Sequence, residues 1–161
     1  SFLVALSNSD VVFCSIGTTQ KKVKGDKEAY RKIDYDIAVN AARFSKMVGC
    51  ETFVLVSSIG ANSKSNNFYL KLKGEIEDAV KETGLHSINI MRPSILLGDR
   101  KENRLAETIS KKIMSAFSFL VPSKYKAIHG RTVAKAMKQA AKENKQGFFF
   151  HEYKEIKTKA K

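Results

Sequence analysis

Short hydrophobic runs alternate along the chain with longer segments in which hydrophobic residues recur every three or four positions. The runs lie at residues 11–16, 52–57 and 87–92, and each is bounded by polar residues, glycine or proline. Continuous hydrophobic runs of this length are typical of strands that are buried on both faces of a sheet. The pattern therefore predicts three buried strands.

The segments between these runs predict two amphipathic helices, over residues 27–48 and 69–83. Gly49 and Gly84 follow them, and glycine is the residue that most often ends a helix. The stripe that we expect to be buried consists of Ile33, Ile37, Ala41, Phe44 and Val48 in the first helix, and of Leu72, Ile76, Ala79 and Val80 in the second.

Strands and helices that alternate at this spacing predict right-handed parallel crossovers and hence an α/β domain. The pattern is weaker after Gly98. There we expect a helix over residues 105–117, a short strand near Ala127-Ile128, a helix over 131–144, a strand over 147–153 and a frayed lysine-rich end. No repeat or linker divides the chain, so it forms one domain or the larger part of one.

Candidate chemistry lies between the second run and the helix after it. The run ends in Ser57-Ser58, and Tyr69 and Lys73 follow across a polar loop. Side chains four residues apart lie on one face of a helix, so the ammonium of Lys73 can approach the phenol of Tyr69. A nearby cation favours the ionised form of a phenol, which is otherwise too weak a base at neutral pH. Serine, tyrosine and lysine in this order can couple proton transfer to hydride transfer.

The tyrosine–lysine spacing alone is a weak signal, because the chain has 23 lysines and five tyrosines among its 161 residues. A second pair with the same spacing occurs at Tyr153 and Lys157. Only Tyr69 follows a strand-like run that ends in hydroxyl side chains and opens an amphipathic helix. We therefore interpret the second pair as a coincidence.

In this arrangement the chain resembles the short-chain dehydrogenase/reductase superfamily, which carries Ser…Tyr-x-x-x-Lys on its fifth strand and the following helix. It is most similar to the atypical, extended branch that includes Tat-interacting-protein-like oxidoreductases and nucleoside-diphosphate-sugar epimerases, over about residues 10–153. The matching segments are Asp10-Val-Val-Phe-Cys-Ser-Ile-Gly-Thr-Thr19, Val56-Ser-Ser-Ile-Gly60, Tyr69-Leu-Lys-Leu-Lys-Gly74 and Met91-Arg-Pro-Ser-Ile-Leu-Leu-Gly98. The resemblance implies a doubly wound, parallel-sheet Rossmann-type domain that binds NADP or NAD.

The resemblance also implies roles for single residues. Ser58 would position the substrate, Tyr69 would transfer a proton, and Lys73 would support Tyr69 and bind the nicotinamide ribose. Further contacts to the cofactor would come from Gly17, Thr18, Thr19, Ser57, Pro93, Ser94 and Ile95. Asn40 stands where extended relatives often place an asparagine near the active site. The loops after Gly98 and between Ser118 and Gly130 would build the substrate pocket.

Each assignment has a purely structural alternative. A serine hydroxyl at a strand end often bonds its own turn. Gly17 is also consistent with an ordinary strand-to-loop glycine, and Pro93 with a residue that only ends the strand.

One departure from the family is large, because the chain has no Gly-rich turn of the kind that cradles the cofactor pyrophosphate. Its first residues correspond to the region where the family's fourth strand begins. We therefore expect residues 1–161 to be the C-terminal part of a single NAD(P)-binding Rossmann-type domain, without its first strands and helices.

The net charge of +13 raises the question of nucleic-acid binding. The excess is mostly lysine at helix-surface spacing, without the arginine–aromatic clusters of single-strand binders, so we do not expect such a partner.

No hydrophobic run approaches the roughly 20 residues that span a bilayer. We expect a cytoplasmic protein with a homodimer as one candidate assembly. We expect no metal site, because the cysteines and histidines do not have the spacing of metal ligands. These residues are Cys14, Cys50, His86, His129 and His151.

The sequence thus predicts an NAD(P)(H)-dependent oxidoreductase that acts on an unknown carbonyl or alcohol substrate. Two alternatives stay open. One is an enzyme like the nucleoside-diphosphate-sugar epimerases, and the other is a catalytically silent regulatory protein that senses NADP.

Overall fold

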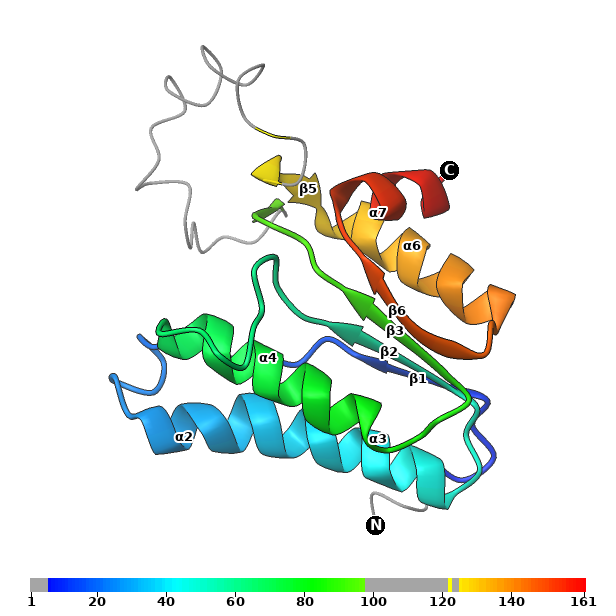
Figure 1. The fold of residues 1–161 in the computed structure, drawn as a ribbon, viewed down its shortest axis with the longest axis horizontal. Helices are drawn as coiled ribbons and strands as arrows, with labels where there is room; N and C mark the ends of the chain where they lie inside the picture. The colour runs from blue at the N-terminus through cyan, green and yellow to red at the C-terminus, as the bar shows by residue number, and fades with distance from the viewer. Residues whose placement is uncertain (1–5, 98–121, 123–124) are drawn as a thin grey trace.

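A computed structural model of the protein describes residues 6–97, 122 and 125–161. Four parallel strands form a sheet in the order β1-β2-β3-β6 (Figure 1). The strands are β1 Val11–Cys14, β2 Thr52–Val56, β3 Ser87–Met91 and β6 Gly147–His151. The helices are α2 Lys27–Arg31, the π-helix η1 Lys32–Asp36, α3 Ile37–Met47, α4 Phe68–Lys81, α6 Gly130–Glu143 and α7 Tyr153–Lys159.

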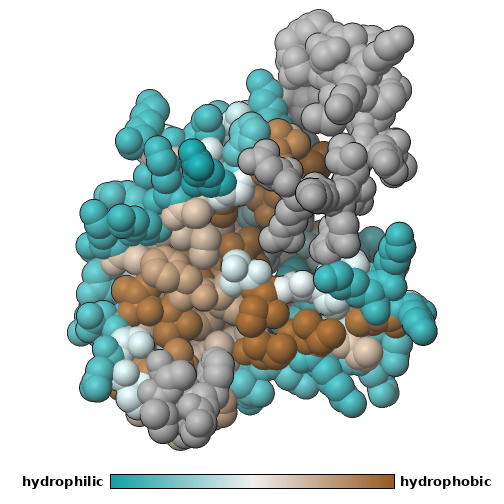
Figure 2. Space-filling model, turned by 180° about the vertical axis from the view of Figure 1, so that it is seen from behind, coloured by the Kyte–Doolittle hydropathy of each residue, from teal (hydrophilic) through white to brown (hydrophobic). Residues whose placement is uncertain are grey.

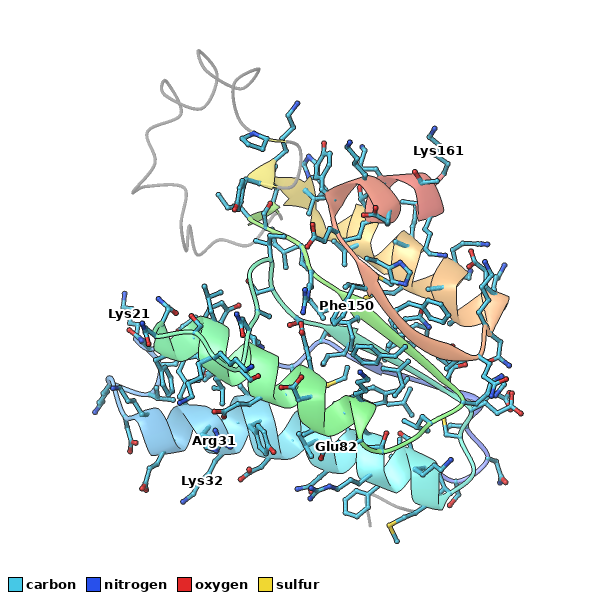
Figure 3. The ribbon with its side chains drawn as sticks, in the orientation of Figure 1. Lys21, Arg31, Lys32, Glu82, Phe150 and Lys161 are labelled. Atoms are coloured by element: carbon cyan, nitrogen blue, oxygen red, sulfur yellow. The ribbon has the colours of Figure 1, made fainter. Side chains whose placement is uncertain are left out.

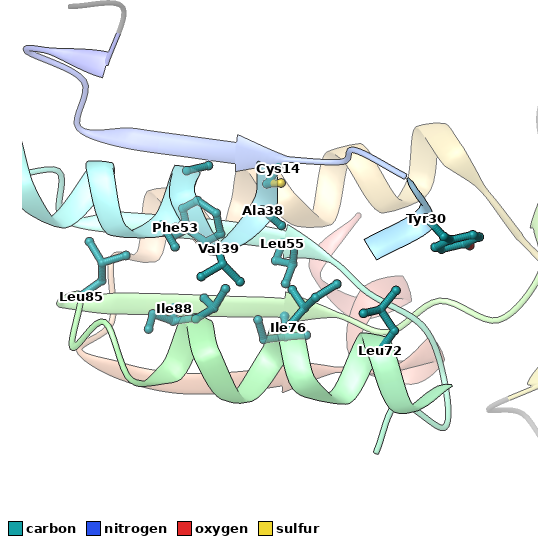
Figure 4. Close-up of a cluster of buried hydrophobic side chains, with 14 residues drawn as sticks. Cys14, Tyr30, Ala38, Val39, Phe53, Leu55, Leu72, Ile76, Leu85 and Ile88 are labelled. Carbon is teal, nitrogen blue, oxygen red and sulfur yellow. The ribbon is translucent and has the colours of Figure 1, made fainter. Parts of the chain in front are cut away.

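The helices cover both faces of the sheet, which makes this a doubly wound α/β domain. Helices α3 and α4 lie on one face, and α6 and α7 lie on the other (Figure 1). Alternate residues of a strand point to opposite faces, so Phe53 and Leu55 of β2 join the core under α3 and α4 (Figure 4). Val54 joins the core under α6. The predicted parallel α/β architecture is therefore confirmed.

The predicted helix over residues 27–48 forms, but of its predicted stripe only Ala41 is fully buried. The buried positions are Tyr30, Asp34, Ala38, Val39, Ala41, Ala42 and Ser45, whereas Ile37 is exposed. The observed buried positions also recur every three or four residues, but most of them lie one residue away from the predicted ones. A search for hydrophobic residues alone missed this stripe because two of its members, Asp34 and Ser45, are polar.

The C-terminal segment also corrects the sequence prediction. Strand β6 ends at His151, and the residues that we expected to be frayed form helix α7. Ile156 of α7 is fully buried against the core under α6, and Lys159 pairs with Glu143 of α6. One buried isoleucine and one ion pair thus hold a segment whose composition is otherwise that of a solvated tail.

The small second sheet forms near the strand predicted at Ala127-Ile128. Strand β4, Leu96–Leu97, pairs in parallel with β5, Ile128–His129. The helix predicted over residues 105–117 lies outside the described residues, as does most of the predicted substrate pocket. Among the helices of the described segments, none is both long and hydrophobic enough to cross a membrane.

Candidate active site

The carboxyl ends of β1, β2 and β3 meet at one edge of the sheet, where open α/β folds bind their ligands. Two backbone hydrogen bonds join the segments that leave β2 and β3. The amide of Ser57 donates to the carbonyl of Met91 at 2.8 Å, and that of Ile59 donates to Pro93 at 3.0 Å. The segment with Ser58 therefore runs beside the segment that begins at Pro93, as the predicted site requires.

Beyond Pro93 the chain is fixed to the second sheet. The hydroxyl of Ser94 donates to the carbonyl of Lys126 at 2.6 Å, and the carbonyl of Ile95 accepts from the amide of Ile128 at 2.9 Å. The hydroxyl of Ser94 thus already has a protein partner. Pro93 is buried and Ile95 is partly buried, so a cofactor could meet these two residues only through the small hydrophobic surface that they leave exposed.

The loop after Ser58 lies directly on helix α4. The amide of Asn62 donates to the carbonyl of Leu70 at 3.0 Å, and the backbone passes so close to Gly74 that a Cβ there would lie 2.1 Å from the nitrogen of Ser63. Only glycine permits this approach. The loop and the first two turns of α4, which carry Tyr69 and Lys73, are consequently one packed unit.

Tyr69 and Lys73 lie on the same side of α4, as their spacing predicts. The Nζ atom of Lys73 is 5.8 Å from the centroid of the Tyr69 ring. The lysine is only 7% exposed, whereas the tyrosine is 36% exposed. The phenol can therefore reach a bound molecule, and the ammonium stays beneath it in the protein.

The ammonium of Lys73 has a partner that we did not predict. Its Nζ donates to Oδ2 of Asp34 at 2.9 Å, and the other carboxylate oxygen of Asp34 accepts from the amide of Thr18 at 2.7 Å. Tyr30 completes this cluster by donating from its hydroxyl to the carbonyl of Thr18 at 3.2 Å. Burial raises the pKa of Tyr30 strongly, with smaller contributions from Asp34 and Tyr69.

Asp34 could have been found from the sequence by one signal. It stands four residues after Tyr30 and four before Ala38, so it occupies a core position of an amphipathic helix. An acidic residue is almost never fully buried without a partner. The structure places Asn40, the residue suggested by the resemblance, on the exposed side of α3.

The predicted cofactor residues after β1 form the other wall of this cluster. Gly17 is exposed and its φ angle is not in the left-handed region, and a Cβ there would lie 3.5 Å from Oδ2 of Asp34, an ordinary contact. Neither the backbone conformation nor a lack of space for a Cβ atom therefore explains why residue 17 is a glycine. Thr18 is tied by its backbone to Asp34 and Tyr30, and Thr19 starts a turn by accepting from Lys22.

The two serines differ in what their hydroxyls contact. Ser57 donates to Oε1 of Glu77 at 2.5 Å, and Glu77 also accepts from two nitrogens of Arg92. The guanidinium of Arg92 lies 3.7 Å from the ring centroid of Phe150. Phe150 is labelled in Figure 3. Ser58 is partly exposed, and within the described part of the chain its hydroxyl makes one long bond, at 3.3 Å, to the carbonyl of Ile59. Of the two hydroxyls, that of Ser58 is the more available to a substrate.

A separate polar network lies under α6 and α7. The Nε2 atom of buried His151 is 2.8 Å from Oδ1 of Asn89, whose amide donates to Ser87. A groove of about 770 Å³ runs over this region, between β6, α6 and α7. It lies away from Tyr69 and Lys73. Among the described residues, no three His, Cys, Asp or Glu side chains gather closely enough to hold a metal ion.

Comparison of the sequence with known families gives a match over most of its length. The HIM1 family model matches residues 1–127. HTATIP2 of Rattus norvegicus is 36% identical over 133 residues, which cover 83% of this chain and 54% of that protein. The mitochondrial protein FMP52 of Candida albicans is 44% identical over 107 residues, which cover 63% of this chain and 46% of that protein. The chain therefore spans about half the length of these curated relatives.

Comparison with solved structures gives the same fold. A UDP-N-acetylglucosamine 4-epimerase from Methanobrevibacter ruminantium superposes with a TM-score of 0.68 at 15% identity, over 98% of this chain and 61% of that chain. MoeE5 in complex with UDP-glucose and NAD superposes with a TM-score of 0.71 at 13% identity, over 97% and 62%. At such low identity the likeness shows the Rossmann-type fold alone.

The names of the relatives overturn one prediction. Several are named as mitochondrial proteins, among them those of Candida albicans, Meyerozyma guilliermondii and Candida glabrata. Our prediction of a cytoplasmic location conflicts with these names and is wrong. It followed from the absence of a bilayer-spanning hydrophobic run, which does not distinguish the cytoplasm from the inside of an organelle.

Proposed function

The chain belongs to the HIM1 family, and we propose that it forms the proton-transfer side of a nicotinamide-dependent oxidoreductase of the short-chain dehydrogenase/reductase type. The observation that carries this proposal is the buried ammonium of Lys73 beneath the solvent-accessible ring of Tyr69. Both lie beside the carboxyl edge of a parallel sheet, where Rossmann-type proteins hold their cofactors.

The residues at this edge fit one end of a nicotinamide dinucleotide. Lys73 uses one bond to Asp34, and an ammonium has three donors, so it retains capacity to bind ribose hydroxyls. Gly17 and Thr18 would line the same end, and Pro93 and Ile95 would contact the nicotinamide. The pyrophosphate requires a Gly-rich turn that this chain does not contain. The dinucleotide, when bound, would supply or accept the hydride.

Each of the three residues of the proposed catalytic site then has a definite role. Tyr69 donates its hydroxyl proton to the substrate oxygen during carbonyl reduction and takes it back during alcohol oxidation. Ser58 donates a hydrogen bond to the same oxygen and holds it against the phenol. Lys73 stabilises the tyrosinate that remains after proton donation. The substrate is a small carbonyl or alcohol compound whose pocket would include residues beyond Gly98.

We further propose that the chain is the C-terminal part of a single domain whose earlier part supplies the pyrophosphate site. Two observations support this. The curated relatives that it matches are about twice as long. Strand β1 also leaves one edge unpaired among the described residues, with Phe13 51% exposed.

The decisive experiment compares two tyrosine variants of the longer protein that contains this chain. We expect Tyr69→Phe to lower NADPH-dependent reduction of a panel of aldehydes and ketones by at least about 100-fold, because general acid catalysis contributes this much. Binding of NADPH, followed by its fluorescence, should change little. The matched control is Tyr153→Phe, which alters the other Tyr-x-x-x-Lys pair, in α7, and should leave turnover unchanged.

The outcomes separate this proposal from its alternatives. Equal turnover of wild type and Tyr69→Phe would refute it. Binding of NADPH without turnover of any substrate would favour a regulatory protein that senses NADP. Interconversion of UDP-sugars without net consumption of the cofactor would favour an epimerase, the activity named for several structural neighbours.

A further inference from the structure

We propose that Asp34 sets the charge balance of the proton-transfer site and positions Lys73 within it. The carboxylate holds the ammonium of Lys73 beneath Tyr69 and joins the same lysine to the loop after β1. The catalytic meaning of this role rests on the proposed function, whereas the arrangement itself does not.

The first support is the burial of the carboxylate. Asp34 is 1% exposed, and a charge at such a depth is costly unless it is paired and hydrogen-bonded. Both of its oxygens are engaged, one with Lys73 at 2.9 Å and one with the amide of Thr18 at 2.7 Å. Asp34 thus connects η1, α4 and the segment after β1 at one point.

The second support is the local backbone. Asp34 lies in the π-helix η1, and π-turns within helices occur frequently at functional sites. Within this turn, residue 34 lies in the buried stripe between Tyr30 and Ala38. The irregular part of the helix thus coincides with the buried carboxylate of Asp34.

The third support is the charge around Tyr69. Among the described residues, the titratable groups of this cluster are Tyr30 from α2, Asp34 from η1, Lys73 from α4 and Cys14 from β1. Tyr30 and Cys14 are neutral, because burial raises the pKa of both. The charges of Lys73 and Asp34 cancel. Tyr69 therefore lies beside a neutral ion pair instead of an isolated cation.

This balance has a chemical consequence. An isolated ammonium would favour the tyrosinate, which is the base for alcohol oxidation. A compensated ammonium leaves Tyr69 protonated over a wider range of pH, which is the state that donates a proton during carbonyl reduction. We infer that Asp34 biases the site toward reduction.

The test measures the charge of Tyr69 directly, without any substrate. Tyrosines labelled with ¹³C at Cζ are titrated by NMR in the longer protein, and Tyr69→Phe identifies the Tyr69 signal. In Asp34→Asn we expect Tyr69 to lose its proton about one pH unit lower than in wild type, because the lysine is no longer compensated. The matched control Asp36→Asn removes the same charge from an exposed position of η1 and should shift the midpoint little.

Either an unchanged or a raised midpoint for Tyr69 in Asp34→Asn overturns the inference. Folding of the variant is checked by the remaining tyrosine signals, and Asp34→Glu, which restores the charge, should return the midpoint toward wild type. The result is independent of catalysis. If turnover is also found, its pH profile should shift in the same direction, and if none is found the proposed function fails while the charge assignment stands.

Discussion

At the scale of single residues, His151 links the structure to the pH dependence of stability. Its side chain is buried, and burial lowers its pKa to about 4, with a further decrease from nearby Lys159. In the unfolded chain a histidine titrates near pH 6.5. Between these two values the unfolded state binds a proton that the folded state does not bind. The contribution of neutral His151 to the free energy of unfolding is therefore fully present above about pH 6.5, and it decreases as the pH falls toward about 4.

This dependence can be tested with His151→Gln, which cannot titrate. We expect the wild-type free energy of unfolding in urea to fall by on the order of 2 kcal/mol more than that of the variant between pH 7 and pH 4.5. His86→Gln is the control, because His86 is exposed and should leave the pH dependence unchanged. An equal loss for wild type and His151→Gln would show that His151 does not cause the acid sensitivity.

The sequence predicts the pair Tyr69–Lys73 because its geometry is local. Residues four apart on a regular helix must share a face, so no tertiary information is needed. The partners of Lys73 and Ser57 could not be predicted in this way, because they are not local. Asp34 is 39 residues away from Lys73, and Glu77 is 20 residues away from Ser57. Their contacts depend on how α4 packs against η1 and β2. Only the presence of acidic residues at buried helix positions hints at them.

At the scale of elements, Gly74 fixes the position of the Ser58 loop relative to α4. A Cβ at this position would meet backbone atoms of Asn62 and Ser63, which cannot rotate away. We expect Gly74→Ala to destabilise the fold by about 1–3 kcal/mol and to lower turnover further by displacing Ser58. Thermal unfolding and steady-state kinetics of the same preparation measure both effects.

Gly84 provides the comparison for this prediction. It follows α4 with a φ of +63°, and a Cβ there would meet nothing within 4 Å. Gly84→Ala should cost about 1 kcal/mol through backbone strain alone and should not affect turnover. If the two variants behave alike, the close approach at Gly74 does not position the active-site loop.

The success of the element prediction also has a physical basis. Strands β2 and β3 were predictable because a strand buried on both faces must be continuously hydrophobic. Strand β1 forms where it was predicted, but the prediction that it is buried is wrong, because only Cys14 of its four residues is buried. Helix α7 was not predictable, because its buried surface depends mainly on Ile156 and on an ion pair with α6. A single hydrophobic residue among lysines carries no periodic signal. The periodicity of hydrophobic residues cannot predict short elements that are held in place by tertiary contacts.

At the scale of the whole molecule, the edge of the sheet at β1 is the feature that bears on the proposed domain organisation. Figure 2 shows a broad hydrophobic area on the face seen from behind. Phe13 of β1 and Ile16 just after it are large, exposed hydrophobic residues. Natural proteins usually protect an edge strand with charges, prolines or a covering segment. None of these is seen on Val11–Cys14 among the described residues.

Hydrogen exchange distinguishes a covered edge from a free one. If the earlier part of the longer protein adds a strand beside β1, amides of Val11–Cys14 that face this edge gain hydrogen-bond partners there. We expect β1 to exchange at least about tenfold more slowly in the longer protein than in a chain of residues 1–161. Strand β3, which lies between β2 and β6 in both forms, should exchange alike and is the internal control. Equal exchange of β1 in the two proteins would mean that the sheet ends at this strand, and the pyrophosphate site would then have to come from elsewhere.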